Sequence, residues 1–204
     1  MGSGREQPKT RRGVMLAWMR DPTKNNIAGI ETGLVMLCSY LKNHLSTRKT
    51  MWELGSFAGE SASYFAGVFK QVHCVDPWQN ACGAPSIEEV EASFDEVAAA
   101  KGNIVKHKGL SEDFAPTVPD GSLDFVYIDA GAHTFEEMTR DWLAWWPKVR
   151  SGGFLGGHDY EIPEYHAADV FPAVAQVIRH QLGQHPEMYG LHVFPDTSWI
   201  VERP

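Results

Sequence analysis

Short apolar segments typical of strands alternate along this chain with amphipathic segments typical of helices. Apolar residues recur at helical spacing over residues 27–46, 87–97 and 135–149. Residues 123–128 are almost wholly apolar, as expected of a buried parallel strand. The other strand candidates are residues 50–54, 71–75, 103–108 and 154–155, and the other helix candidates are residues 61–69 and a segment through Phe171, Val174 and Ile178. Residues 151–153, Ser-Gly-Gly, are expected to end the helix that starts at 135. This alternation predicts an α/β fold with a doubly wound, mostly parallel sheet and helices on both faces.

The alternation stops near the end of the chain. Residues 189–194 and 198–202 both resemble strands, and only the turn at 195–197 separates them. Strands joined by so few residues pair antiparallel, so we expect a hairpin at one edge of the sheet. Ligands of doubly wound proteins bind beyond the carboxyl ends of the strands, and functional residues are therefore expected just after each strand.

Length and charge predict one acidic domain with a basic tail. A chain of 204 residues suits a single hydrophobic core. Residues 1–24 carry six basic and two acidic side chains, a net charge of +4, so the total of -8 leaves -12 on residues 25–204. We interpret residues 1–24 as a flexible tail and residues 25–204 as one domain. The acidic domain argues against nucleic acid as a partner.

The cysteines and the apolar segments indicate a cytoplasmic protein without a membrane contact. Cys38, Cys74 and Cys82 are odd in number and lack the spacing of a metal finger, which favours a reducing compartment. No segment approaches the roughly 20 apolar residues that cross a bilayer. The first residues also lack the apolar block of a secretion signal.

The first candidate binding motif is the turn from Glu53 to Gly59, which reads ELGSFAG. Its glycines allow the backbone to approach a ligand closely. The spacing differs from both the dinucleotide fingerprint and the phosphate-binding P-loop, so neither of those functions is supported. An ordinary connection between a strand and a helix is the alternative interpretation.

A second motif, Asp76-Pro77-Trp78, ends the next predicted strand 23 residues after Glu53. Nucleoside-binding α/β proteins place at this point a carboxylate that accepts hydrogen bonds from the ribose hydroxyls. The indole of Trp78 would supply a flat wall for a purine. The alternative is an Asp-Pro pair that only opens a turn.

Two later strands each end in an acid and a histidine, Asp129 with His133 and His158 with Asp159. Carboxylates suit a hard divalent cation, and histidine can bind a softer ion or act as a general base. The alternatives are that Asp129 and His133 cap the following helix and that His158 is a hydrogen-bonded core residue.

Five motifs together resemble class I S-adenosylmethionine-dependent methyltransferases. The resemblance is to the branch that contains macrocin-type O-methyltransferases and proteins named after cephalosporin hydroxylase, and it covers residues 48–203. It implies a Rossmann-like, seven-stranded sheet with an antiparallel last strand. It also implies methyl transfer from S-adenosylmethionine to a hydroxyl on a sugar or natural product. The motifs are ELGSFAGES, VDPW, KGLSEDFAP, DGSLDFVYIDAGAHTFEEMTRD and GGFLGGHDY.

The resemblance assigns residues to each part of the cofactor. The ribose would lie at Asp76, and the adenine near Pro77 and Trp78. The residues implied for the methionine and ribose part are Glu53, Gly55, Ser56, Phe57 and Gly59, and those implied for the far side of the adenine are Gly109, Leu110 and Ser111.

The resemblance also implies an active site at Asp129, with His133 as the base for the acceptor hydroxyl. Metal-dependent relatives bind magnesium at positions that match Asp129, His158 and Asp159. Two departures stand out: the spacing from Asp129 to His133 is one residue longer than in many relatives, and His158-Asp159 replaces a pair of acids.

Three other functions stay open at this point. A non-catalytic binding module would leave the glycine turn and Asp76 without a purpose, and a metal-dependent hydrolase would not explain them. Methylation of nucleic acid would rest on the basic tail alone. The expected partner is a small hydroxyl compound, walled by residues 27–46, 80–85 and 160–166, with the helix at 27–46 also a candidate contact between copies of the chain.

Overall fold

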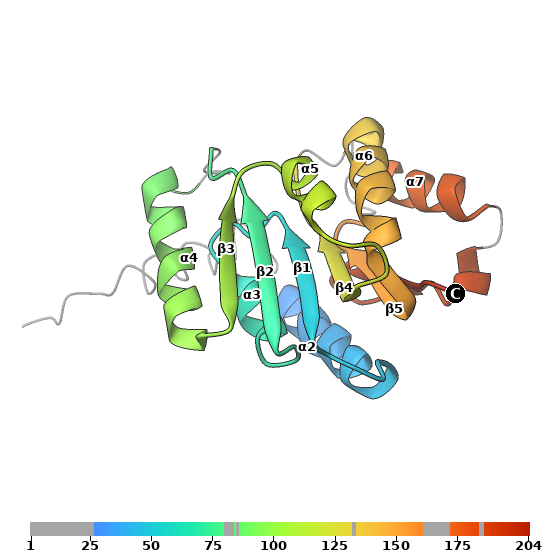
Figure 1. Cartoon of the computed structure of the whole chain (residues 1–204), viewed down its shortest axis with the longest axis horizontal. Helices are drawn as coiled ribbons and strands as arrows, with labels where there is room; N and C mark the ends of the chain where they lie inside the picture. Colours follow the sequence, from blue (N-terminus) through green and yellow to red (C-terminus); the bar gives the residue numbers. More distant parts are fainter. Residues whose placement is uncertain (1–26, 80–83, 85, 132–133, 161–171, 184–185) are drawn as a thin grey trace, which may run out of the picture.

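A seven-stranded sheet forms the centre of the protein in the computed structural model, which describes residues 27–79, 84, 86–131, 134–160, 172–183 and 186–204. The strands are β1 (Thr50–Leu54), β2 (Gln71–Asp76), β3 (Ile104–Lys108), β4 (Leu123–Ile128), β5 (Val149–Gly157), β6 (His192–Val193) and β7 (Trp199–Glu202). Their order in the sheet is β3-β2-β1-β4-β5-β7-β6 (Figure 1).

The first five strands are parallel, and β7 runs against its neighbours. β1 pairs with β2 and β4, β2 with β3, and β4 with β5, all in parallel register. β7 pairs antiparallel with both β5 and β6. The predicted closing hairpin and the doubly wound, Rossmann-like sheet are therefore confirmed.

Helices cover both faces of the sheet (Figure 1). They are α2 (Ile27–His44), α3 (Glu60–Phe65), α4 (Ile87–Lys101), α5 (Ser111–Phe114), α6 (Phe135–Trp145) and α7 (Pro172–Leu182), with short 3-10 turns η1 (Ala115–Thr117), η2 (Trp146–Lys148) and η4 (Pro186–Tyr189). Helices α2, α3 and α4 bury their apolar side chains in one hydrophobic core. Helices α6 and α7, with residues at the end of α5, enclose a second core on the other face. Each core shields one face of the sheet from water.

Several predicted boundaries were wrong. The helix expected to reach residue 149 ends at Trp145, because Pro147 enters a 3-10 turn and has no amide hydrogen to continue an α-helix. Strand β5 therefore begins at Val149 and includes residues 151–153, which were expected to end the helix. The predicted helix at 61–69 is shorter. The strand at 189–194 shrinks to two residues, since η4 extends to Tyr189 and Gly190 continues the turn with a φ of 65°.

The remaining sequence-based expectations concern the cysteines, the tail and the membrane. Cys38 and Cys74 are free and buried in the core, whereas Cys82 and residues 1–24 lie outside the described residues. Within the described ranges, no helix combines the length and the apolar character needed to cross a bilayer.

Candidate functional site

The loops after β1, β2, β4 and β5 begin side by side at the carboxyl edge of the sheet. Backbone hydrogen bonds continue beyond the strand ends: the Asp129 amide donates to the Leu54 carbonyl at 2.8 Å, and the His158 amide donates to the Ile128 carbonyl at 3.1 Å. The Gly55 amide is bonded in the same way to the end of β2. The sheet thus brings the predicted donor and acceptor motifs together.

The turn after β1 brings backbone rather than side chains to this edge. Gly55 has a φ of 83°, and a β-carbon there would lie 2.0 Å from the Asp129 carbonyl oxygen. No residue other than glycine fits that approach. Phe57 also has a positive φ, of 42°, and Gly59 directly precedes α3. The turn is partly exposed at Gly55 and Phe57, and a ligand can approach its backbone there.

Glu53 lies beneath the turn and is fully buried. Its carboxyl group accepts hydrogen bonds from Ser61 Oγ at 2.5 Å and from Cys74 Sγ at 3.4 Å. Burial raises the pKa of Glu53 to about 7, although these hydrogen bonds oppose the rise. In this structure Glu53 supports the turn from below, and its predicted contact with a cofactor stays a prediction.

Asp76 joins the turn after β1 to the loop after β2. One carboxylate oxygen accepts the Phe57 amide at 3.0 Å, and the other accepts the Trp78 amide at 2.6 Å. A carboxylate oxygen has more than one lone pair, so Asp76 can still accept hydrogen bonds from two neighbouring hydroxyls. That capacity matches the ribose role predicted for this residue.

The Trp78 ring is enclosed rather than open. Its exposed fraction is 4%, its ring centroid lies 4.8 Å from that of Phe94, and the Lys106 ammonium lies 4.7 Å from it. The indole nitrogen donates to the Phe57 carbonyl at 2.9 Å. The ring is therefore packed in the core in this structure, and its role as a wall for a purine stays a prediction. Pro77 beside it is half-buried.

The loop after β3 contributes Gly109, Leu110 and Ser111. The Gly109 amide donates to the Asp76 carbonyl at 3.1 Å, which places this loop next to the end of β2. The Ser111 hydroxyl donates to Asp141 of α6 at 2.5 Å, and burial raises the pKa of that carboxyl. Leu110 is 49% exposed, so it offers the apolar surface of this loop. Asp141 is the last residue of the motif that begins at Asp120, but no role was predicted for it from the sequence.

Asp129, His158 and Asp159 converge as predicted from the order of the strands. One potential ligand atom from each lies within 4.8 Å of the others. His158 Nδ1 lies 3.0 Å from Asp159 Oδ1, while His158 Nε2 is buried without a hydrogen-bond partner. Asp159 has a φ of 60°, an uncommon conformation for a residue with a side chain. Two carboxylates and an imidazole with an unsatisfied nitrogen fit a divalent cation.

The charge of His158 depends on its acidic neighbours. Burial disfavours the charged imidazole, but the hydrogen bond with Asp159 and the negative charges of Asp129, Asp159 and Asp196 outweigh it. Together they raise the pKa of His158 to about 9. The cluster is therefore a place where positive charge is stabilised.

Asp196 is a buried acid near this cluster that sequence reasoning missed. It lies in the turn between β6 and β7, where it accepts hydrogen bonds from the Ser198 amide at 3.1 Å and the Ser198 hydroxyl at 2.9 Å. Ser198 Oγ is also 3.0 Å from the Tyr127 hydroxyl. A β-carbon at Gly33 of α2 would fall 1.9 Å from Asp196 Cγ, so glycine is needed for this packing. In the sequence, Pro195 before Asp196 indicated only a turn.

Some predicted site residues cannot be placed. His133, the candidate base, lies outside the described residues, as do most of residues 80–85 and all of 161–171. Tyr160 lies at the end of the described segment and is buried, 8% exposed, in the core under α6 and α7.

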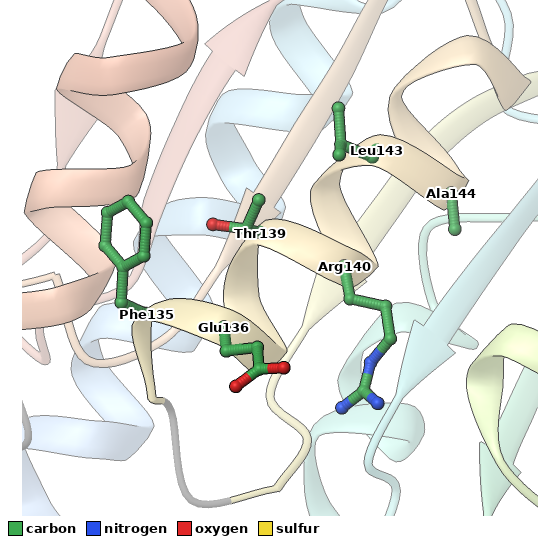
Figure 2. A pocket seen from close by; sticks show the side chains of 6 residues that line it. All are labelled: Phe135, Glu136, Thr139, Arg140, Leu143 and Ala144. Carbon is green, nitrogen blue, oxygen red and sulfur yellow. The ribbon is translucent and has the colours of Figure 1, made fainter.

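A groove lies along one face of α6 (Figure 2). Its volume is about 640 Å³. The residues that line it are Phe135, Glu136, Thr139, Arg140, Leu143 and Ala144. It contains none of the residues predicted for the cofactor or the metal.

The strand order, the antiparallel β7 and the acid at the end of β2 define the class I methyltransferase fold that the sequence motifs resemble. Residues 52–160, more than half of the chain, match the family model described as "Methyltransferase domain". The chain belongs to this family. Comparison with curated proteins gives no match.

Solved structures of similar fold include three described as O-methyltransferases. NovP is 15% identical with a TM-score of 0.60, and the match covers 83% of this chain and 80% of NovP. CalS11, a TDP-rhamnose 3'-O-methyltransferase, is 13% identical with a TM-score of 0.60 and coverages of 97% and 96%. TomG from Streptomyces achromogenes, solved with SAM, is 14% identical with a TM-score of 0.58 and coverages of 98% and 92%. At these identities the likeness establishes a shared fold.

Proposed function

We propose that this protein transfers a methyl group from S-adenosylmethionine to a hydroxyl of a small molecule, a sugar or a natural product. The observation that carries the proposal is the position of Asp129. Its backbone packs against the glycine turn at Gly55, while its side chain belongs to the cluster with His158 and Asp159. A donor held by the turn and an acceptor held by the cluster would therefore meet at this residue.

The donor would lie over the turn after β1. S-adenosylmethionine supplies an electrophilic methyl group with a good leaving group. The backbone of residues 55–59 would hold its methionine part, and the Asp76 carboxylate would accept hydrogen bonds from its ribose hydroxyls. Leu110 would lie against the adenine, next to Pro77, with Ser111 held in place by Asp141. The protein's task is to align the methyl group with the acceptor oxygen.

The acceptor hydroxyl would need activation, because a neutral alcohol is a poor nucleophile. We assign this task to His133 as the general base and to Asp129, which would hold the acceptor or the base in position. General base catalysis typically contributes about 10²–10⁴ in rate. The one additional residue between Asp129 and His133, relative to many relatives, still leaves both on the segment that follows β4.

Asp129, His158 and Asp159 would hold a divalent cation such as magnesium. The unpartnered Nε2 of His158 and the two carboxylates suit such an ion. A bound cation lowers the pKa of a hydroxyl that contacts it, which would support deprotonation by His133. His158 would have to release its proton before it binds the ion.

The test is transfer of a labelled methyl group from S-adenosylmethionine to a panel of sugars, glycosides and phenolic natural products. We expect label on a hydroxyl oxygen with the wild-type chain and loss of transfer with Asp129→Asn. Asp120→Asn is the matched control, since Asp120 is an exposed acid paired with Lys148 at 2.7 Å. Transfer to nitrogen or carbon instead of oxygen would contradict the hydroxyl specificity.

A further inference from the structure

Most lysine and arginine side chains of the described residues lie far from the carboxyl edge of the sheet. Of 18 such residues, six fall within residues 1–26, and the other twelve belong to the described part of the chain. Eight of these twelve lie at the amino edge or on segments that lead to it, namely Lys42, Arg48, Lys49, Lys70, Lys101, Lys148, Arg150 and Arg203. They cannot contact a ligand at the opposite edge.

The remaining four cations are Lys106, Lys108, Arg140 and Arg179. Lys106 and Lys108 pair with Glu91 at 2.8 and 2.7 Å, and Arg140 pairs with Glu112 at 3.2 Å. Arg179, in the last turn of α7, also has an interaction partner. No lysine or arginine of the described ranges is therefore unpaired at the edge where the site lies.

Carboxyl groups gather at that same edge. They are Glu53, Asp76, Asp129, Asp159 and Asp196. The internal segments outside the described residues do not change the balance, because 80–83, 85, 132–133, 161–171 and 184–185 contain neither lysine nor arginine. Residues 161–171 even add three acids to the sequence after β5.

The helices that begin at this edge also carry acidic side chains in their first turns. A free helix amino terminus binds phosphate through its amide hydrogens and its dipole. Here the first turns of four helices that follow strands carry acidic side chains. In α6, Thr134 and Glu137 form a capping box that already satisfies amide hydrogens. The negative charge of these first turns opposes the binding of a further anion there.

We propose that the acceptor methylated at this site carries no phosphate group. It would be a free sugar, a glycoside or another uncharged or amine-bearing hydroxyl compound, and not a nucleotide-linked sugar. This inference rests on the proposed function and narrows its acceptor. Proteins hold phosphate with arginine, lysine or free amide hydrogens, and among the described residues the edge around Asp129 offers no arginine or lysine that is not already paired with an acid or otherwise engaged.

A cation held by Asp129, His158 and Asp159 would not take the place of arginine or lysine in holding a diphosphate. The reacting hydroxyl and the diphosphate of a nucleotide-linked sugar are separated by the sugar ring. One ion that serves the hydroxyl therefore leaves the diphosphate without a partner. The proposal also distinguishes this protein from CalS11, whose acceptor is a TDP-linked sugar.

The test uses the full chain, loaded with S-adenosylhomocysteine, in a calorimetric titration with thymidine diphosphate, with and without magnesium. We expect a dissociation constant for thymidine diphosphate at least about 100-fold weaker than that for S-adenosylhomocysteine in the same preparation. We also expect no methyl transfer to TDP-rhamnose above the rate without acceptor, with methyl rhamnoside as the matched uncharged compound.

Tight binding of thymidine diphosphate, or methylation of TDP-rhamnose, would overturn the proposal. Either result would overturn the proposal even if binding requires magnesium. It would also do so if binding is lost when the six basic residues of the tail are replaced by glutamine. Failure of S-adenosylhomocysteine to bind would instead contradict the proposed function. The two failures are therefore distinguishable in one set of titrations.

Discussion

Gly55 packs directly against the backbone of Asp129. A β-carbon on Gly55 would fall 2.0 Å from the Asp129 carbonyl oxygen and 2.6 Å from its carbonyl carbon. The two residues follow the adjacent strands β1 and β4, so this contact joins the turn assigned to the donor to the residue assigned to the acceptor. Its closeness fixes the distance between the two halves of the site.

Gly55→Ala should destabilise the fold and weaken the binding of S-adenosylhomocysteine. The β-carbon would push the two strand ends apart, and overpacking of this kind costs about 1–3 kcal/mol in the free energy of unfolding. Gly102→Ala is the matched control, since Gly102 has a similar φ of 76° and its β-carbon would meet no atom within 4 Å. Urea denaturation measures both variants. Equal losses would show that the contact with Asp129 has no effect of its own.

Asp76→Asn should weaken the binding of S-adenosylhomocysteine by about 10- to 100-fold, because a hydrogen bond to a charged group is worth about 1.5–3 kcal/mol. Asparagine keeps an acceptor for only one of the two amides, of Phe57 and Trp78, so the variant also loses one hydrogen bond that holds the turn. Calorimetry gives the affinity, and circular dichroism checks the fold. An unchanged affinity, with Asp120→Asn as the control, would remove Asp76 from the ribose site.

Glu53→Gln should change how stability depends on pH. The pKa of Glu53 is raised from 4.5 to about 7 in the folded chain, so the folded state holds a proton that the unfolded state has lost between these values. The contribution of Glu53 to stability therefore falls as pH rises from 4.5 to 7, by at most about 1.4 kcal/mol per pH unit. The glutamine variant lacks this slope. Identical slopes in urea titrations of both chains would contradict the burial of an ionisable Glu53.

Magnesium or manganese should raise the thermal midpoint of the protein, because a ligand that binds only the folded state stabilises it. Asp159→Asn and His158→Gln should each lose this shift, while both retain the affinity for S-adenosylhomocysteine. Manganese paramagnetic resonance measures the bound ion directly. A wild-type chain whose midpoint is the same in EDTA and in magnesium would contradict the assignment of the cluster as a metal site.

The sequence predicted the fold well because the sheet is specified by local pattern. Strand β4 is buried at every position and reads as an apolar run, and the short turn before β7 dictated the antiparallel pair. The errors came at helix ends. The helix before β5 ends at Trp145 rather than at 151–153, and β5 pairs with β4 at Val149 and again from Phe154, with an irregularity between them.

The sequence predicted the site residues that directly follow strands. It missed those whose positions depend on packing between distant segments. Asp129, His158 and Asp159 could be brought together in advance because parallel strands end at one edge. Trp78 could not be judged, since its burial depends on Phe94 of α4. Asp196 could not be found either, because its place depends on the contact with Gly33 of α2.

A crystal structure of the full chain with S-adenosylhomocysteine tests the central claim most directly. The account predicts the ligand at the carboxyl edge, with its ribose hydroxyls at Asp76 and its methionine part over the turn at Gly55. Its sulfur should point toward Asp129. A ligand bound elsewhere, or ribose hydroxyls that do not contact Asp76, would contradict the account.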